Sequence, residues 1–478
     1  MSMFLTLIAI LPFLFAAAAF ACGRRVRLAR SILGVCAVAN FALVLTLCVA
    51  AACSHKMSLS VLQWLPVDSG RIQGAVMFST AALFLFAALY SVSWLAADAA
   101  SHAEHVREKR MRENVFCCLL CAFAGAMNLV IFSENAGFMW VAMEATTLLS
   151  APLIIFHRNP KTVGAMWKYI MACSVGIGFA LFGTMLAARA APSGISGLNL
   201  PEMAACAELM DPFWIKAAFV FILAGYGTKM GLAPFHAWIQ TAYPAAPAPA
   251  TAFMSGALVN CSFLAIWRFY LMAPPPVQEL SRICRSMMIA LGLVSLAVAA
   301  VNMLKEKDCA RMLAHSSVEQ MGLVIIMAAL DVSILSTHLI VHAFLKCALF
   351  MIVGCILISY KSRSATQVRG MFGRNPFLAT LWIGGIFALC AMPPSPLFFT
   401  ELALIREAGL LLGGVILFFL FVIFCAMSKM ALSMTMGEAQ HDSQHEAREK
   451  SVVGWKLLAA PTALIVFAFV AGIAWRFA

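Results

Sequence analysis

The sequence predicts an all-α integral membrane protein with about fourteen transmembrane helices. Of its 478 residues, 63% are hydrophobic and only 11% are charged, whereas a soluble domain carries about 25% charged residues. The mean hydropathy is +0.92. The apolar runs are about 20 residues long, which suits helices across a bilayer and is too long for barrel strands. In lipid such a run must satisfy its own backbone hydrogen bonds, as a helix does.

The apolar runs, numbered here as helices 1 to 14, fall into four groups. The N-terminal segment, residues 1–113, holds the helices expected at 2–22, 31–53 and 73–97. Residues 114–272 hold helices 4–8, expected at 114–133, 136–156, 166–189, 213–236 and 249–272. Residues 284–432 hold helices 9–13, expected at 286–304, 314–331, 335–359, 377–405 and 408–432. Residues 433–478 hold a polar loop and the last helix, 456–475. The first run is not expected to be a cleavable signal, because its basic cluster follows the apolar stretch.

Helices 7 and 12 are predicted to be interrupted by glycine and proline. The residues concerned are Gly225, Gly227, Gly231 and Pro234 around Lys229 in helix 7, and Gly384, Gly385, Pro393, Pro394 and Pro396 before Glu401 in helix 12. Two breaks five helices apart suggest that helices 4–8 and 9–13 are repeats, and an odd number of helices inverts the second repeat. The alternative is that proline and glycine are simply commoner in membrane helices.

The net charge of +12 comes from basic residues that are concentrated in alternate loops. Twenty-one of the 33 basic residues fall in loops that follow odd-numbered helices. Nine fall in the loops after even-numbered helices, at the helix ends beside them or at the C-terminus, and three lie inside helices. The basic clusters lie at 24–30, 107–112, 158–168, 305–311, 361–374 and 448–456. The positive-inside rule then places these loops in the cytoplasm and both termini outside. We expect the lipid bilayer, and no nucleic acid, to be the partner of this charge pattern.

Two ionisable residues lie in the middle of helices 5 and 7. A charge at the centre of a membrane helix costs about 2.5–3.5 kcal/mol on insertion scales, so such residues need partners and usually have a function. Glu144 and Lys229 could neutralise each other. A partner that moves could then make the carboxyl release or capture a proton. The alternative is a static buried ion pair that fixes helix packing.

Helix 11 carries His338, His342 and Lys346, whose spacing of four places them on one face. Histidine exchanges protons near neutral pH, so a proton relay through water is the preferred interpretation. Two histidines and a lysine are a poor ligand set for a metal. Glu401 follows the break in helix 12, and Lys429 in helix 13 is interpreted as a residue that reaches the membrane surface.

No cofactor or metal is expected in this chain. The sixteen cysteines are scattered, mostly inside predicted helices. Cys118 and Cys121 form a CxxC in an apolar helix, where thiols usually serve packing. No second pair completes a zinc or iron–sulfur set, and no phosphate-binding or dinucleotide-binding motif is present.

Several segments together resemble the antiporter-like membrane subunits of respiratory complex I, multisubunit sodium/proton antiporters and group 4 membrane-bound hydrogenases. The resemblance is greatest to the hydrogenase-4 component F type. It rests on MWVAMEATTLLSAP at 139–152, WKYI at 167–170, GTKMGLAPFHAW at 227–238, AHSSVEQMG at 314–322, HAFLK at 342–346 and MPPSPLFFTE at 392–401.

The resemblance implies a fourteen-helix fold with inverted five-helix repeats, each forming a half-channel. It implies that Glu144 and Lys229 serve the first half-channel, and that Lys346 and Glu401 serve the second, with the two histidines between. Lys168, His236, Asn260 and Lys429 are secondary candidates. Where relatives often have a titratable residue on helix 8, this chain has Ser255 and Asn260. Where relatives often read Leu-Pro-Asp-Ala-His, residues 239–243 read Ile-Gln-Thr-Ala-Tyr.

The leading hypothesis is a proton-translocating, or sodium-translocating, subunit in the membrane arm of a redox-driven assembly. The resemblance implies other membrane subunits and a peripheral redox module, such as a hydrogenase, as partners, and a bacterial or archaeal cytoplasmic membrane as location. Two alternatives stay open. One is a membrane partner that energises inorganic carbon uptake, and the other is an anchor that moves no ions.

Overall fold

The computed structural model describes residues 2–23, 25–53, 67–101, 106–192, 198–272, 278–436 and 454–477. The described residues are helical or irregular, with two isolated β-bridges and no strand. Most of the polar loop expected before the last helix, together with Arg24, Arg448 and Lys450, lies outside these residues.

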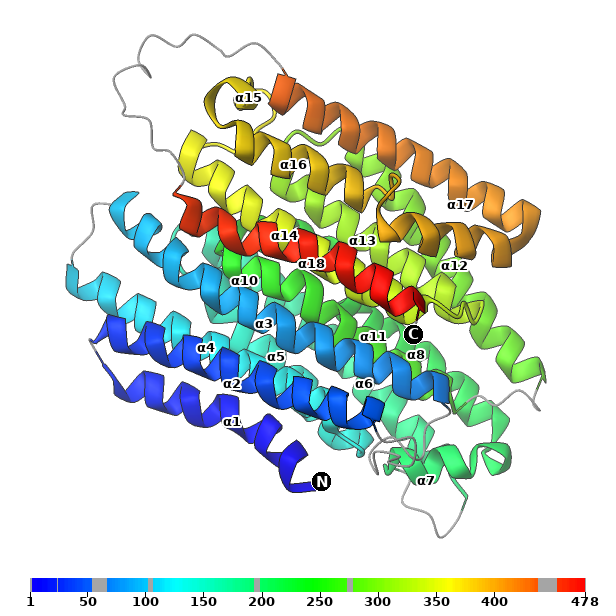
Figure 1. Ribbon diagram of the computed structural model, residues 1–478. Helices are drawn as coiled ribbons and strands as arrows, with labels where there is room; N and C mark the ends of the chain where they lie inside the picture. The colour runs from blue at the N-terminus through cyan, green and yellow to red at the C-terminus, as the bar shows by residue number, and fades with distance from the viewer. Residues whose placement is uncertain are drawn as a thin grey trace.

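The helices form one bundle whose long members run roughly parallel (Figure 1). The N-terminal segment consists of α1 (Ser2–Ala21), α2 (Val26–Cys53) and α3 (Val67–Ser101). There follow α4 (Val106–Phe132), α5 (Ala136–Ile154), α6 (Pro160–Ala190), α7 (Leu200–Ala205), a 3₁₀ turn (Ala207–Leu209), α8 (Pro212–Met230), α9 (Ala237–Ala245), α10 (Ala248–Phe253), a π-helical segment (Met254–Leu258) and α11 (Val259–Tyr270). The remaining helices are α12 (Gln278–Met303), α13 (Cys309–Ala329), α14 (Leu335–Tyr360), α15 (Met371–Arg374), α16 (Pro376–Leu389), α17 (Pro396–Met436) and α18 (Trp455–Phe477).

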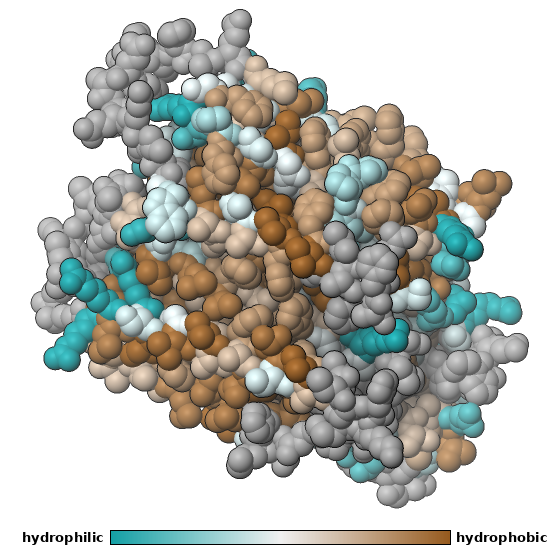
Figure 2. Space-filling model, in the orientation of Figure 1, coloured by the Kyte–Doolittle hydropathy of each residue, from teal (hydrophilic) through white to brown (hydrophobic). Residues whose placement is uncertain are grey.

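Ten helices in the described residues are long and apolar enough to cross a membrane, and three shorter apolar helices accompany them. Hydrophobic residues cover the middle of the visible face, and hydrophilic residues gather toward the two ends of the helices (Figure 2). By contrast, the membrane-length parts of α13 and α14 are completely buried inside the bundle. A helix with no lipid-facing side can carry polar residues without exposing them to hydrocarbon.

The predicted interruptions lie at residues 231–236, between α8 and α9, and at residues 390–395, between α16 and α17. Several helices begin up to eight residues earlier than expected, and at one point the division into helices itself differs. The helices expected at 377–405 and 408–432 meet within α17, whose one non-helical residue is Gly409, with φ 73° and ψ −179°. Because only glycine adopts this conformation readily, Gly409 allows the chain to reverse between the two parts.

Short polar side chains set where the helices around the interior begin. Asn135 accepts a hydrogen bond from the backbone N–H of Phe138 at 3.0 Å and so caps α5. Asn159 and Thr162 form a reciprocal capping box at the start of α6. Asp308 accepts from two backbone N–H groups of α13. These contacts satisfy N–H groups that a helix cannot satisfy itself.

Two close contacts hold the interior helices in register. In the first, α6 and α8 pack through glycine. A Cβ atom added at Gly225 would lie 2.4 Å from the backbone nitrogen of Ala180, and one at Gly176 would lie 2.6 Å from Cβ of Thr228. In the second, the buried guanidinium of Arg268 in α11 donates to the carbonyls of Val130, Ile131 and Ser133 at the end of α4. Such carbonyls have no partner within their own helix.

Candidate functional site

Lys229 lies in the last turn of α8, directly before the first break, and its side chain is completely buried. The ammonium donates to Oγ1 of Thr147 in α5 at 2.7 Å and to the hydroxyl of Tyr169 in α6 at 2.9 Å. It also lies 5.0 Å from the centre of the Tyr169 ring, within range of a cation–π interaction. Three helices therefore converge on this one charge.

Glu144 is half-buried on α5, one turn before Thr147. Its carboxylate accepts from Oγ1 of Thr147 at 3.3 Å and from Oγ of Ser174 at 3.1 Å. Because a threonine hydroxyl donates and accepts at the same time, Thr147 joins Glu144 to Lys229 through two hydrogen bonds. The predicted neutralising pair is thus linked by a hydroxyl, and not by a direct contact.

The two histidines of α14 are completely buried and lie with their ring centres 5.6 Å apart. Nε2 of His342 is 3.0 Å from Oδ1 of Asn260 in α11. Nδ1 of His338 is 2.9 Å from the hydroxyl of Thr400 in α17. The amide of Asn260 in turn donates to the carbonyl of Leu339 at 3.1 Å. Two separate hydrogen-bonded pairs, one to α11 and one to the residue before Glu401, therefore lie side by side on α14.

Lys346 lies inside the bundle, as expected, with a completely buried side chain. Its ammonium donates to the carbonyl of Leu313 at 2.5 Å and to the hydroxyl of Ser316, so it points at α13 and not directly at the interrupted helix. Glu319, one turn further along α13, is within electrostatic reach of Lys346 and also of Glu401. A second buried acid therefore lies near both Lys346 and Glu401.

Gln320 connects the two acids. Its amide donates to Glu319 at 2.9 Å and its side chain also interacts with the carboxyl of Glu401. Glu319 and Glu401 are both buried. The interior of the bundle therefore holds two acids next to one glutamine.

The remaining candidates lie at different depths. Lys168 and Lys429 are exposed, away from the buried series. His236 begins α9 inside the first break and lies within electrostatic reach of His315 in α13. Ser255 is buried in the π-helical segment and donates to its own backbone, at the carbonyl of Ala252.

Sequence reasoning missed Glu319 and Gln320, although a signal for Glu319 was present. Glu319 is a charge in the middle of an apolar helix, which is the same signal that identified Glu144. The partner hydroxyls of Thr147, Tyr169 and Thr400 gave no such signal, because threonine and tyrosine are ordinary residues in membrane helices. Only the packing of the helices brings them to the charges.

The fold and the buried charges define an antiporter-like integral membrane protein. The family described as "NADH:quinone oxidoreductase/Mrp antiporter, TM" matches residues 133–431. The chain therefore belongs to this family.

Among curated relatives, the chain is 31% identical over 290 residues to a hydrogenase-4 component F homolog of Methylacidiphilum infernorum, covering 59% of this chain and 60% of the relative. It is 28% identical over 315 residues to NADH-quinone oxidoreductase subunit N of Desulforudis audaxviator, covering 63% and 61%. The matches thus span about three fifths of these relatives' length.

Two solved structures share the fold over nearly the whole chain. A chain of the Mrp complex from Dietzia sp. DQ12-45-1b superposes with a TM-score of 0.82 at 19% identity, covering 100% of this chain and 96% of that one. A chain of an archaeal membrane-bound sulfane sulfur reductase gives a TM-score of 0.81 at 21% identity, covering 99% and 95%.

Proposed function

We propose that this protein is a proton-translocating subunit in the membrane arm of a redox-driven complex of the hydrogenase-4 or complex I kind. The observation that carries the proposal is the hydrogen-bonded link from Glu144 through Thr147 to the buried Lys229. A hydroxyl that joins an acid to a base can pass a proton between them when either group changes its charge. The first half-channel uses this link.

The second half-channel uses Lys346, Glu319 and Glu401, and Asn260 with the two histidines connects it to the first. Asn260 does not titrate, so its role in the proposal is to orient the His342 ring through their hydrogen bond. Protons cross this point by exchange on the histidines and through water. Sodium is the alternative ion, and it would need oxygen ligands in place of this nitrogen-rich series.

The proposal includes a topology and an assembly. The chain crosses the cytoplasmic membrane of a bacterium or archaeon fourteen times, with both termini outside, and helices 4–8 and 9–13 are inverted repeats. Redox chemistry takes place in a peripheral partner, because the proposed role of this chain requires no cofactor. The names of the relatives support a hydrogenase or quinone oxidoreductase as that partner.

Everted membrane vesicles that carry the assembled complex provide the test. With the partner's electron donor present, the native complex should acidify the vesicle interior. Lys229→Ala should assemble and still transfer electrons to an artificial acceptor, but acidification should fall by at least about tenfold, since the link loses its base. Acidification at the native rate in an assembled variant would refute the proposal.

Mass spectrometry of the co-purified subunits separates the alternatives. Nickel–iron or iron–sulfur partners support a redox-driven complex. A zinc protein resembling carbonic anhydrase would instead indicate inorganic carbon uptake, and a redox partner without ion flux would indicate an anchor.

A further inference from the structure

A histidine that the proposed pathway does not use lies on α13, one turn before Glu319. The side chain of this residue, His315, is only 5% exposed. Residues four positions apart lie on the same face of a helix, so His315 and Glu319 share one face of α13. Lys346 contacts α13 at this level, because its ammonium donates to the carbonyl of Leu313 and to the hydroxyl of Ser316. His315 is also within electrostatic reach of Lys346.

An acid connects His315 to the end of the bundle where α13 begins. Nε2 of the ring lies 3.9 Å from Oε2 of Glu306, in the loop between α12 and α13. The Glu306 side chain is 17% exposed, so it lies at the boundary between solvent and the interior. Its other carboxylate oxygen accepts from the backbone N–H groups of Lys307 and Asp308 at 2.9 and 3.0 Å. These two hydrogen bonds hold the acid beside the histidine.

A second polar contact connects His315 to a pocket at the same end of the bundle. Nδ1 of its ring lies 3.5 Å from the amide nitrogen of Gln240 in α9. Gln240 lines a pocket of about 360 Å³ between the start of α6, the end of α9 and the start of α13. The charged residues among its described lining are all basic, namely Lys161, Lys168, Arg311 and Arg363. Glu306 therefore supplies the acid that this described lining lacks.

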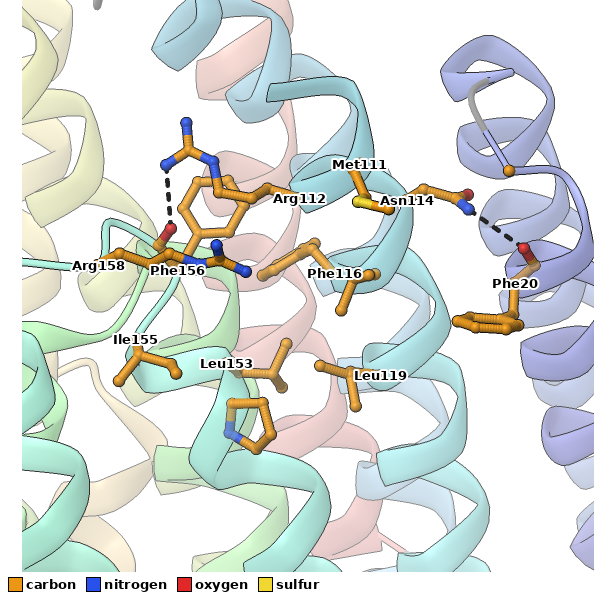
Figure 3. A pocket seen from close by; sticks show the side chains of 13 residues that line it. Phe20, Met111, Arg112, Asn114, Phe116, Leu119, Leu153, Ile155, Phe156 and Arg158 are labelled. Atoms are coloured by element: carbon orange, nitrogen blue, oxygen red, sulfur yellow. Dashed lines mark hydrogen bonds between the residues drawn. The ribbon is translucent and has the colours of Figure 1, made fainter. Parts of the chain in front are cut away.

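A larger pocket at this end does not adjoin the candidate site. Its volume is about 470 Å³, and it opens where α1, α4 and α5 meet. Figure 3 shows side chains from these three segments around it, among them Phe20, Leu119 and Leu153. None of the buried charges of the two half-channels is among its described lining residues. The smaller pocket, through Gln240, is thus the one that reaches toward Lys346.

We propose that His315 is the residue through which protons enter the second half-channel from this end of the bundle. The inference rests on the proposed function and adds an entry point to it. Glu306 takes a proton from the solvent and passes it to the imidazole of His315. The imidazole, now protonated on both nitrogens, gives a proton through water to the unprotonated amine of Lys346. The acid and the imidazole return to their initial states, so one proton has moved inward.

Everted vesicles that carry the assembled complex test this entry, since their outer face is the proposed cytoplasmic side. His315→Ala should lower the initial rate of membrane-potential generation by about tenfold or more, because a group that transfers the proton is lost. Millimolar imidazole in the medium should restore part of the rate, since imidazole exchanges protons near neutral pH. A histidine that only fixes helix packing would give no such rescue. A potential-sensitive dye is the probe, because imidazole buffers the vesicle interior.

His157→Ala is the matched control. Nε2 of His157 also lies 3.9 Å from a carboxylate, that of Asp98, and its loop lies at the same end of the bundle. This variant should keep the native rate with and without imidazole. Glu306→Gln is a second test variant, and it keeps an oxygen for the two backbone N–H groups of the loop. It should lower the rate by a smaller factor than His315→Ala, because solvent can still reach the histidine at Gln240.

The Lys229→Ala variant in the same vesicles separates this proposal from the proposed function. If Lys229→Ala is defective while His315→Ala is native, or is not rescued by imidazole, the entry through His315 is overturned and the proposed function stands. A native rate in Glu306→Gln would overturn the entry as well, and it decides the matter if His315→Ala does not assemble. A native rate in assembled Lys229→Ala would refute the proposed function, and the entry with it.

Discussion

At the scale of single residues, function depends on hydroxyl groups as much as on charges. The hydroxyl of Thr147 links Glu144 to Lys229 through two hydrogen bonds, and the hydroxyl of Thr400 forms a hydrogen bond with His338. A buried ammonium that loses its hydrogen-bond acceptor destabilises the folded protein, because a buried polar group without a partner costs about 1–3 kcal/mol. These hydroxyls therefore supply hydrogen-bond partners to groups that are buried away from water.

Thr147→Val should separate the acid from the base while conserving volume. We expect an assembled protein whose proton translocation falls by about tenfold or more, because general acid–base steps contribute at least that much. The matched control is Thr146→Val, whose hydroxyl donates only within its own helix, to the carbonyl of Met143 at 2.6 Å. Vesicle acidification, normalised to the amount of assembled complex, is the measurement. Equal rates in the two variants would show that the hydroxyl link carries no protons.

Glu319→Gln should impair proton translocation as strongly as a substitution of Glu401, a pathway acid that was predicted from the sequence. The substitution keeps the size of the side chain but removes the acid between Lys346 and Glu401. Lys346 keeps its hydrogen bonds to α13, so the fold should persist. Glu208→Gln in an exposed position is the control. A native rate of acidification in the Glu319 variant would place the path elsewhere.

At the scale of helices, close packing sets the distances within the site. Gly225 and Gly176 bring α6 and α8 together, and Tyr169 of α6 can then reach Lys229 of α8. The π-helical segment before α11 has a similar role. An extra residue per turn shifts the register of the helix beyond it, and Asn260 lies two residues past this segment, where it faces His342.

Gly225→Ala should destabilise the protein by about 1–3 kcal/mol, the usual cost of overpacking, because the added methyl collides with the backbone of α6. Separation of the helices should also weaken the contact between Lys229 and Tyr169. Gly178→Ala, where the added methyl meets nothing within 4 Å, should be neutral or slightly stabilising. Thermal unfolding of both variants in lipid nanodiscs measures the difference. If Gly225→Ala were as stable as Gly178→Ala, close packing of α6 against α8 would not be what requires glycine at position 225.

The helices and their breaks could be predicted because their signals are local. Apolar runs mark the helices, and Pro234 and Pro393 lie within the two interruptions. The π-helical segment had no local signal, since its residues are small or apolar. The contacts of Lys346 with α13 depend on which helices pack together, and no run of residues in α14 specifies that. The sequence thus predicted the charged residues of the site better than their partners.

At the scale of the whole molecule, the membrane-length parts of α13 and α14 are completely buried and carry Glu319, the two histidines and Lys346. By contrast, α2, α6 and α17 expose apolar side chains. The family match and the fold similarity extend across this arrangement. The basic clusters of the loops lie at the ends of the helices, where they can set orientation.

The proposed orientation can be tested in intact cells. A single cysteine introduced into the predicted cytoplasmic loop at 107–112, in a background without accessible thiols, should be shielded from a membrane-impermeant maleimide. A cysteine at the N-terminus should be labelled. The expected result rests on the bias of basic residues toward loops after odd-numbered helices. Labelling of the loop and protection of the N-terminus would reverse the topology.

The buried lysines and the buried arginine of the bundle are also synthesised in a defined order relative to their hydrogen-bond acceptors. In the described residues, Lys229 of α8 bonds to α5 and α6, Arg268 of α11 bonds to the end of α4, and Lys346 of α14 bonds to α13. Every acceptor lies in a helix that leaves the ribosome before the base that needs it. Since proteins are made and begin to fold from the N-terminus, each positive charge enters the bilayer when its acceptors are already there. Biogenesis therefore never has to hold these charges in lipid while it waits for a later helix.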